Sequence, residues 1–129
     1  MVNINDIHLG NWVQVEIEGE KLTGKVERKS VERIGVQVKE ELGWYFPKDV
    51  FPILLTEDWL KHFEFIKEAE TNGAVTYNHG PFQLVFPDKE NKQYILLRAH
   101  GAHGREFKDG LYVHTLQNHY HGMTKVFIE

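Results

Sequence analysis

The first 55 residues alternate between hydrophobic and polar positions in short runs. Ile34, Val36 and Val38 show the period-two spacing of a strand with one buried face. Runs of this kind cover residues 12–17, 22–31, 34–38 and 44–46, and turns that contain glycine lie at residues 18–20 and 41–43. Four or five short strands joined by tight turns predict a small antiparallel β unit. Two architectures fit this pattern, an SH3-like barrel and an open meander packed on a helix.

A short helix is predicted directly after this unit. Thr56 is a favourable N-cap, and the two acidic residues that follow it suit the positive end of the helix dipole. Trp59, Leu60 and Phe63 lie at helical spacing and are expected to be buried together. The hydrophobic pair at residues 65–66 extends this stripe.

The remaining residues predict an antiparallel meander followed by a second helix. Turn residues separate three short strands, at residues 75–77, 82–86 and 94–97. The helix is expected from Gly110 to His121, with Gly122 ending it and residues 125–128 forming a final strand. The whole chain is therefore expected to have an α+β fold.

The second helix has a hydrophobic side and a polar side. At about 100° per residue, its hydrophobic residues share one arc that should face the core. This arc consists of Tyr112, Val113, Leu116, Tyr120 and Met123. The opposite side, which we expect to face solvent, carries His114, Gln117, Asn118 and His121.

Composition predicts a single cytoplasmic domain. With 129 residues, of which 41% are hydrophobic and 26% charged, the chain has enough apolar material for one core. We expect one domain over residues 1–129, with a β part at 1–55 and a helix–meander–helix part at 56–129. Cysteine is absent, the N-terminus has no signal-peptide pattern, and no apolar run nears the length of a membrane span.

The charge pattern predicts no strong nucleic-acid binding. The formal net charge is −4 at pH 7. Five cationic residues lie close together between Lys21 and Arg33, but Glu20, Glu27 and Glu32 are interleaved with them. Such interleaving is typical of a solvated surface of mixed charge, not of a basic footprint for phosphates.

Three segments of the chain are distinctive as a set. They are Asn-Asp-Ile-His-Leu-Gly-Asn-Trp-Val at 5–13, Pro-Ile-Leu-Leu-Thr-Glu-Asp-Trp-Leu at 52–60 and Tyr-Val-His-Thr-Leu-Gln-Asn-His-Tyr at 112–120. In order and rough spacing they resemble the opening, middle and C-terminal motifs of a family of small uncharacterised bacterial proteins. Members of that family are found around prophages and mobile elements.

The resemblance implies a shared fold and genomic setting, and it implies no reaction. Two positions depart from the family pattern. Glu64 stands where the family usually has a glycine after the first helix. Residues 124–128, Thr-Lys-Val-Phe-Ile, stand where the family usually closes with Thr-Gly-Glu-Glu-Leu.

The sequence carries no recognisable catalytic constellation. Cysteine is absent, Ser30 is the one serine, and no glycine-rich phosphate loop follows a strand and opens a helix. Eight histidines are the unusual feature, yet none belongs to a zinc signature. On a helix His119 and His121 point about 200° apart, whereas His100 and His103, which lie between glycines, could share an ion.

Two functional hypotheses follow. The first is a non-enzymatic binding or interaction protein, whose partner is another protein or a small polar ligand. The second is a metal-dependent enzyme built on the histidine-rich C-terminal half. No catalytic residue, metal ligand or cofactor is assigned, and the oligomeric state is left open. The candidate binding residues are His100, His103, His114, Gln117, Asn118 and His121.

Overall fold

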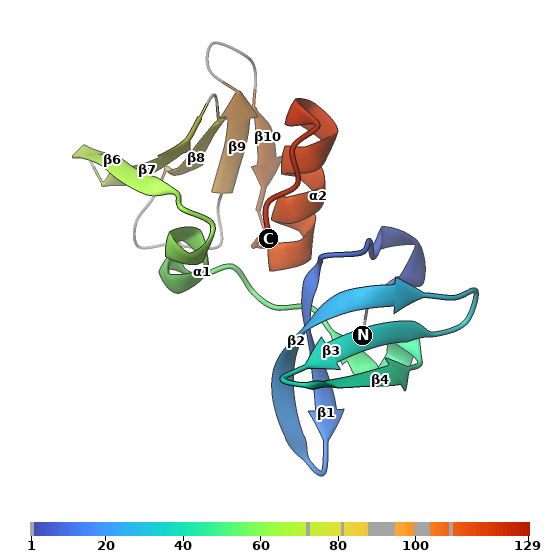
Figure 1. The fold of residues 1–129 in the computed structure, drawn as a ribbon. Coiled ribbons are helices and arrows are strands. Elements are labelled where there is room, and N and C mark those ends of the chain that lie inside the picture. Colours follow the sequence, from blue (N-terminus) through green and yellow to red (C-terminus); the bar gives the residue numbers. More distant parts are fainter. Residues whose placement is uncertain (1, 72, 81, 88–94, 100–103, 109) are drawn as a thin grey trace. The chain divides into compact units, whose positions relative to one another are not determined.

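Two antiparallel sheets of five strands each organise the chain (Figure 1). The computed structural model describes residues 2–71, 73–80, 82–87, 95–99, 104–108 and 110–129. Contacts divide the chain into unit 1, Met1–Ile53 with Tyr112–Glu129, and unit 2, Leu54–Leu111. The C-terminal helix therefore belongs with the N-terminal sheet, whereas the sequence pattern grouped it with the second half. The expectation that both units fold together as one domain stays a prediction.

Unit 1 is a sheet in the order β4-β3-β2-β1-β5, with every neighbouring pair antiparallel. Its elements are η1 (Ile4–Asp6), β1 (Trp12–Ile17), β2 (Glu20–Lys29), β3 (Ile34–Val38), β4 (Glu41–Tyr45), η2 (Pro47–Asp49) and β5 (Val50–Phe51). The predicted α+β class with antiparallel sheets is confirmed. No pairing joins β4 to β5 within the described part of the chain, so a closed barrel is not found there.

Branched side chains on one face of this sheet form the core of unit 1. Val13 and Val15 on β1, Val26 on β2 and Val36 on β3 are fully buried, because alternate residues of a strand point to the same face. Gly24 on β2 is required by close packing. A Cβ atom at this position would lie 2.6 Å from Cγ1 of Val36.

The second helix, α2 (Val113–Thr124), ends later than predicted. It continues through Gly122 and ends at Lys125, which adopts a left-handed φ of 63°. The N–H of Lys125 donates to the carbonyl of His121 and so satisfies one of the last helical acceptors. Residues 125–128 form no strand, so the final strand predicted from the sequence is wrong.

The buried side of α2 includes polar residues that we expected to face solvent. Leu116 is buried as predicted, but His114 and Gln117 are buried as well. Tyr112 and Met123, which we placed in the core, are 44% and 50% exposed. The buried arc is therefore rotated toward the polar side of the helix, and the expectation of a solvated polar face is wrong for these two buried residues.

Unit 2 combines a short helix with a sheet in the order β10-β9-β8-β7-β6. Its elements are α1 (Glu57–His62), β6 (Ile66–Thr71), β7 (Ala74–His79), β8 (Phe82–Phe86), β9 (Ile95–Ala99) and β10 (Arg105–Phe107). The three predicted strands of the meander correspond to β7, β8 and β9. The strands β6 and β10 extend it on either side.

The helix α1 begins after Thr56, as predicted, but it ends before residues 65–66, which we expected to extend its hydrophobic stripe. Thr56 is its N-cap, with Oγ1 accepting a hydrogen bond from the N–H of Trp59 at 3.4 Å. Leu60 and Phe63 are buried, while Trp59 is partly exposed. Glu64 then adopts a left-handed φ of 64°, a conformation that favours glycine. The hydrophobic pair that follows leads into β6 instead of extending the helix.

Two glycines provide a matched test of this packing. Gly24→Ala should lower the free energy of unfolding by about 1–3 kcal/mol, because the added methyl group overlaps Val36 and the Gln37 carbonyl. Gly122→Ala should raise it by about 0.5–1 kcal/mol, because Gly122 lies inside α2 with open space at its Cβ position. Urea unfolding measures both values, and a loss of stability in Gly122→Ala would contradict the observed helix end.

Candidate binding site around His114

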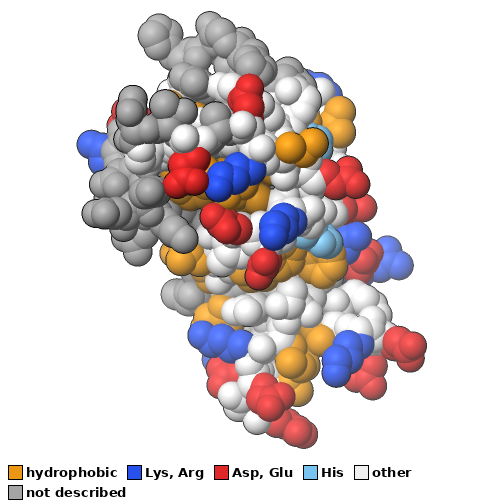
Figure 2. Space-filling view, turned by 90° about the vertical axis from the view of Figure 1, so that its left-hand side faces the viewer, with side chains coloured by type: hydrophobic (Ala, Val, Ile, Leu, Met, Phe, Trp, Pro, Cys, Tyr) orange, Lys and Arg blue, Asp and Glu red, His pale blue; other side chains and the backbone are white. Residues whose placement is uncertain are grey.

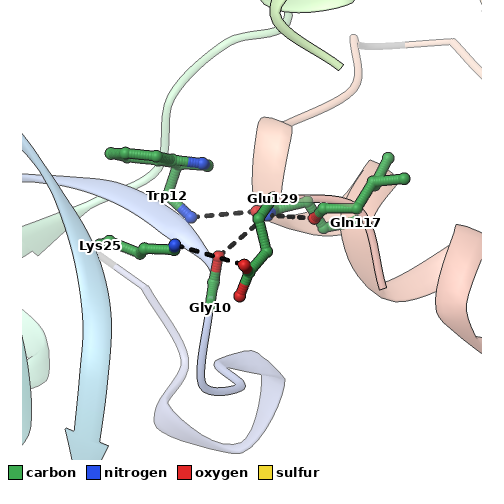
Figure 3. A network of polar contacts seen from close by, with 6 residues as sticks. Gly10, Trp12, Lys25, Gln117 and Glu129 are labelled. Atoms are coloured by element: carbon green, nitrogen blue, oxygen red, sulfur yellow. Dashed lines mark hydrogen bonds and ion pairs between the residues drawn. The ribbon is translucent and has the colours of Figure 1, made fainter. Parts of the chain in front are cut away.

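The side-chain amide of Gln117 lies at the centre of a buried polar network in unit 1 (Figure 3). Its Oε1 accepts a hydrogen bond from the backbone N–H of Trp12 at 3.0 Å. Its Nε2 donates to the carbonyl of Gly10 at 3.0 Å and to that of Ile128 at 2.9 Å. Since both hydrogens of the amide are used, Gln117 serves the structure and has no donor left for a ligand.

Asn11 and Asn118 extend this network toward the N-terminal segment. Nδ2 of Asn11 donates to Oδ1 of Asn118 at 2.9 Å, and Nδ2 of Asn118 donates to the carbonyl of Asp6 at 2.8 Å. Oδ1 of Asn11 accepts from the backbone N–H of His8 at 2.8 Å. These bonds fix the η1 segment beside α2, although the two are more than 100 residues apart in sequence.

A polar pocket of about 340 Å³ lies between the η1 segment and α2. We call it the His114 pocket, and it is lined by Asn5, Asp6, His8, His114, Thr115, Asn118 and His119. Thr115, Asn118 and His119 reach it together because residues three or four apart share one side of a helix. The η1 segment contributes the opposite wall.

His114 is the most buried titratable residue of this pocket. It is 7% exposed, and its Nδ1 is buried without a hydrogen-bond partner in the described structure. Burial lowers the pKa of His114 below its ordinary value, while nearby Asp6 raises it and His8 lowers it further. The imidazole is therefore neutral at pH 7 and can act as one donor and one acceptor.

The structure brings together some of the predicted binding residues and separates others. His114 and Asn118 line the His114 pocket, while Gln117 lies in the network beside it. His121 is exposed on α2, with its ring centroid 5.7 Å from that of Phe127. The two remaining predicted residues, at positions 100 and 103, lie outside the described residues.

Sequence reasoning missed the residues that complete the pocket. These are Asn5, Asp6, His8, Thr115 and His119. The helical spacing of Thr115 from Asn118 and His119, three and four residues later, was a usable signal. No local signal links residues 5–8 to α2, because only the folded contacts bring them together.

The described residues contain no group of three or more histidine, aspartate or glutamate side chains that could hold a metal ion. The hypothesis of a metal-dependent enzyme stays a prediction, because the two histidines that could share an ion lie outside the described residues. Within the described residues, no helix is long and apolar enough to cross a membrane.

Comparisons with protein-family models, curated proteins and solved structures find no match for the chain.

Charged side chains of both signs are intermingled on the face of the molecule shown in Figure 2. Several cations of unit 1 lie against aromatic rings. Nζ of Lys21 is 4.4 Å from the ring centroid of Phe51, and the guanidinium of Arg33 is 4.6 Å from that of Phe46. The expectation that the protein does not bind nucleic acids strongly stays a prediction.

Replacing Gln117 by methionine tests the network. Gln117→Met keeps the side-chain length but leaves the Trp12 N–H and the carbonyls of Gly10 and Ile128 without this partner. The free energy of unfolding should fall by about 3 kcal/mol or more, because each buried unpaired group costs about 1–3 kcal/mol. The surface variant His121→Gln should change stability by less than about 0.5 kcal/mol. Chemical denaturation compares the two, and equal stabilities would contradict the structural role of Gln117.

The stability of the protein should depend on His114 at mildly acidic pH. Because burial lowers the pKa of His114 in the folded state, the unfolded chain binds its proton more readily. The contribution of the neutral His114 to the free energy of unfolding is complete above the pKa of histidine in the unfolded chain, about 6.5. It is lost as the pH falls toward the lower pKa of His114 in the folded state. Between about pH 7.5 and pH 5.5, His114→Gln should therefore lose less stability than the wild type. His121→Gln is the matched control, and identical slopes for all three proteins would refute this assignment.

Proposed function

We propose that this protein is a non-enzymatic binding protein whose unit 1 holds a small uncharged polar ligand in the His114 pocket. The observation that carries the proposal is the His114 imidazole, which lines the pocket and has hydrogen-bonding capacity that the described protein leaves unused. Buried polar atoms without partners are uncommon, and each one calls for an explanation. A ligand in the pocket supplies a partner for Nδ1 once the side chains that cover this atom move aside.

The chemistry of the pocket favours an uncharged ligand. Among the described residues its lining contains no lysine or arginine, and Asp6 contributes a carboxylate that disfavours anions. The neutral His114 imidazole, the Thr115 hydroxyl and the Asn118 amide offer both donors and acceptors. A molecule that bears several hydroxyl or amide groups, such as a sugar or a nucleoside, matches this mixture.

Amide chemical shifts measured by NMR during titration test the proposal. The probes are glucose and uridine, with acetate as the anionic comparison. At least one uncharged probe should shift signals of residues 5–8 and 114–119 more than acetate does. Thr115→Val, which removes a hydroxyl from the lining, should weaken this binding, and His121→Gln should leave it unchanged. The proposal is wrong if acetate binds more tightly, or if no probe shifts these signals.

We infer an SH3-like arrangement for the sheet of unit 1. The order β4-β3-β2-β1-β5, with the 3-10 turn η2 just before the short strand β5, supports this inference. Folds of this kind serve many unrelated functions, so the arrangement agrees with a binding role without naming a ligand. A genomic setting near prophages or mobile elements is likewise a proposal, resting on the three distinctive segments alone.

A further inference from the structure

Unit 2 contains a second pocket, of about 280 Å³, whose chemistry differs from that of the His114 pocket. Its walls are mainly apolar. Val75, Phe86, Ile95 and Leu111 line it, and each of these side chains is at most 9% exposed. Binding sites for small molecules are typically concave and apolar, with a few placed polar groups that fix the orientation of the ligand.

A pair of polar side chains, Glu57 and Tyr77, lies on the lining of this pocket. The hydroxyl of Tyr77 donates to Oε1 of Glu57 at 3.0 Å. Burial, followed by this hydrogen bond, raises the pKa of Tyr77 to about 12, so the phenol keeps its proton at neutral pH. Because that proton is directed at Glu57, the phenol oxygen keeps only its capacity as an acceptor.

Glu57 determines which ligands the pocket favours. Among the described residues of the lining, it alone has a carboxylate, and none has a cationic side chain. Its Oε2 has no hydrogen-bond partner among the described residues. Glu57 itself is exposed, which places the charge at the mouth of the pocket, while the side chains of Val75, Phe86, Ile95 and Leu111 are buried.

These features exclude two of the three simple ligand classes. An anion would be repelled by the Glu57 carboxylate. A neutral hydrocarbon would fill the apolar walls but would offer no donor to Oε2 of Glu57 or to Oη of Tyr77. An ammonium group on an apolar body provides donors for both acceptors and the complementary charge.

The geometry points to unit 2 as a binding site for a small apolar primary amine. The ammonium group lies at the mouth between Glu57 and Tyr77, and the hydrocarbon part packs against Val75, Phe86 and Ile95. This site is separate in residues and in chemistry from the His114 pocket, so either one can exist without the other.

Calorimetry and NMR titration with hexylamine, hexan-1-ol and hexanoate test the site. These probes share a hydrocarbon chain and differ in the head group. Hexylamine should bind most tightly and should shift signals of the residues that line the pocket. Glu57→Gln should weaken hexylamine binding by about tenfold or more, since a hydrogen bond to a charged group contributes about 1.5–3 kcal/mol.

Asp58→Asn is the matched control for this experiment. Asp58 is exposed, lies next to Glu57 in the first turn of α1 and is not part of the pocket lining, so both variants change the charge of the helix N-terminus equally. Hexylamine binding should be unchanged in Asp58→Asn. Circular dichroism checks that both variants are folded. The inference is overturned if hexan-1-ol or hexanoate binds as tightly as hexylamine, if both variants weaken binding equally, or if no probe binds.

Discussion

One buried amide, that of Gln117, holds together three parts of unit 1 that are distant in sequence. It accepts a hydrogen bond from the backbone N–H of Trp12, at the start of β1, and donates two, to the carbonyls of Gly10 and Ile128. All three partners are backbone groups that need a hydrogen bond when they lose contact with water. An apolar side chain would fill the same space but would leave these groups unpaired. The position of α2 against the sheet therefore depends on this amide.

The His114 pocket is a consequence of that arrangement. Asn118 follows Gln117 in sequence and hydrogen-bonds to the carbonyl of Asp6, which holds η1 beside the helix. His114 lies one turn earlier on α2, so it is placed between the helix and this segment. Residues 5–13 and 112–120, two of the distinctive segments in the sequence, thus contact each other. The side chains of Asn11, Gln117 and Asn118 are explained by these contacts.

The two units place polar groups in their pockets in opposite ways. In unit 1 a nearly buried imidazole lies among amides and hydroxyls, and its neutral state follows from desolvation. In unit 2 a carboxylate and a phenol lie at the edge of an apolar wall and form a hydrogen bond with each other. In both pockets a polar atom has unused hydrogen-bonding capacity among the described residues. That shared property supports the proposed binding function.

The sequence by itself determined the local structure. The alternation of Ile34, Val36 and Val38 marked a strand, and Thr56 marked the start of α1, because side-chain direction and capping depend on close neighbours in the chain. The tertiary structure alone decided which side of α2 is buried. A helical wheel sorts residues by hydrophobicity, and by that measure Gln117 belongs in water. Its burial is stabilised by partners as far as 107 residues away, and no pattern within the helix contains that information. His8 and His114 are likewise far apart in the sequence, and only the folded chain brings them together in one pocket.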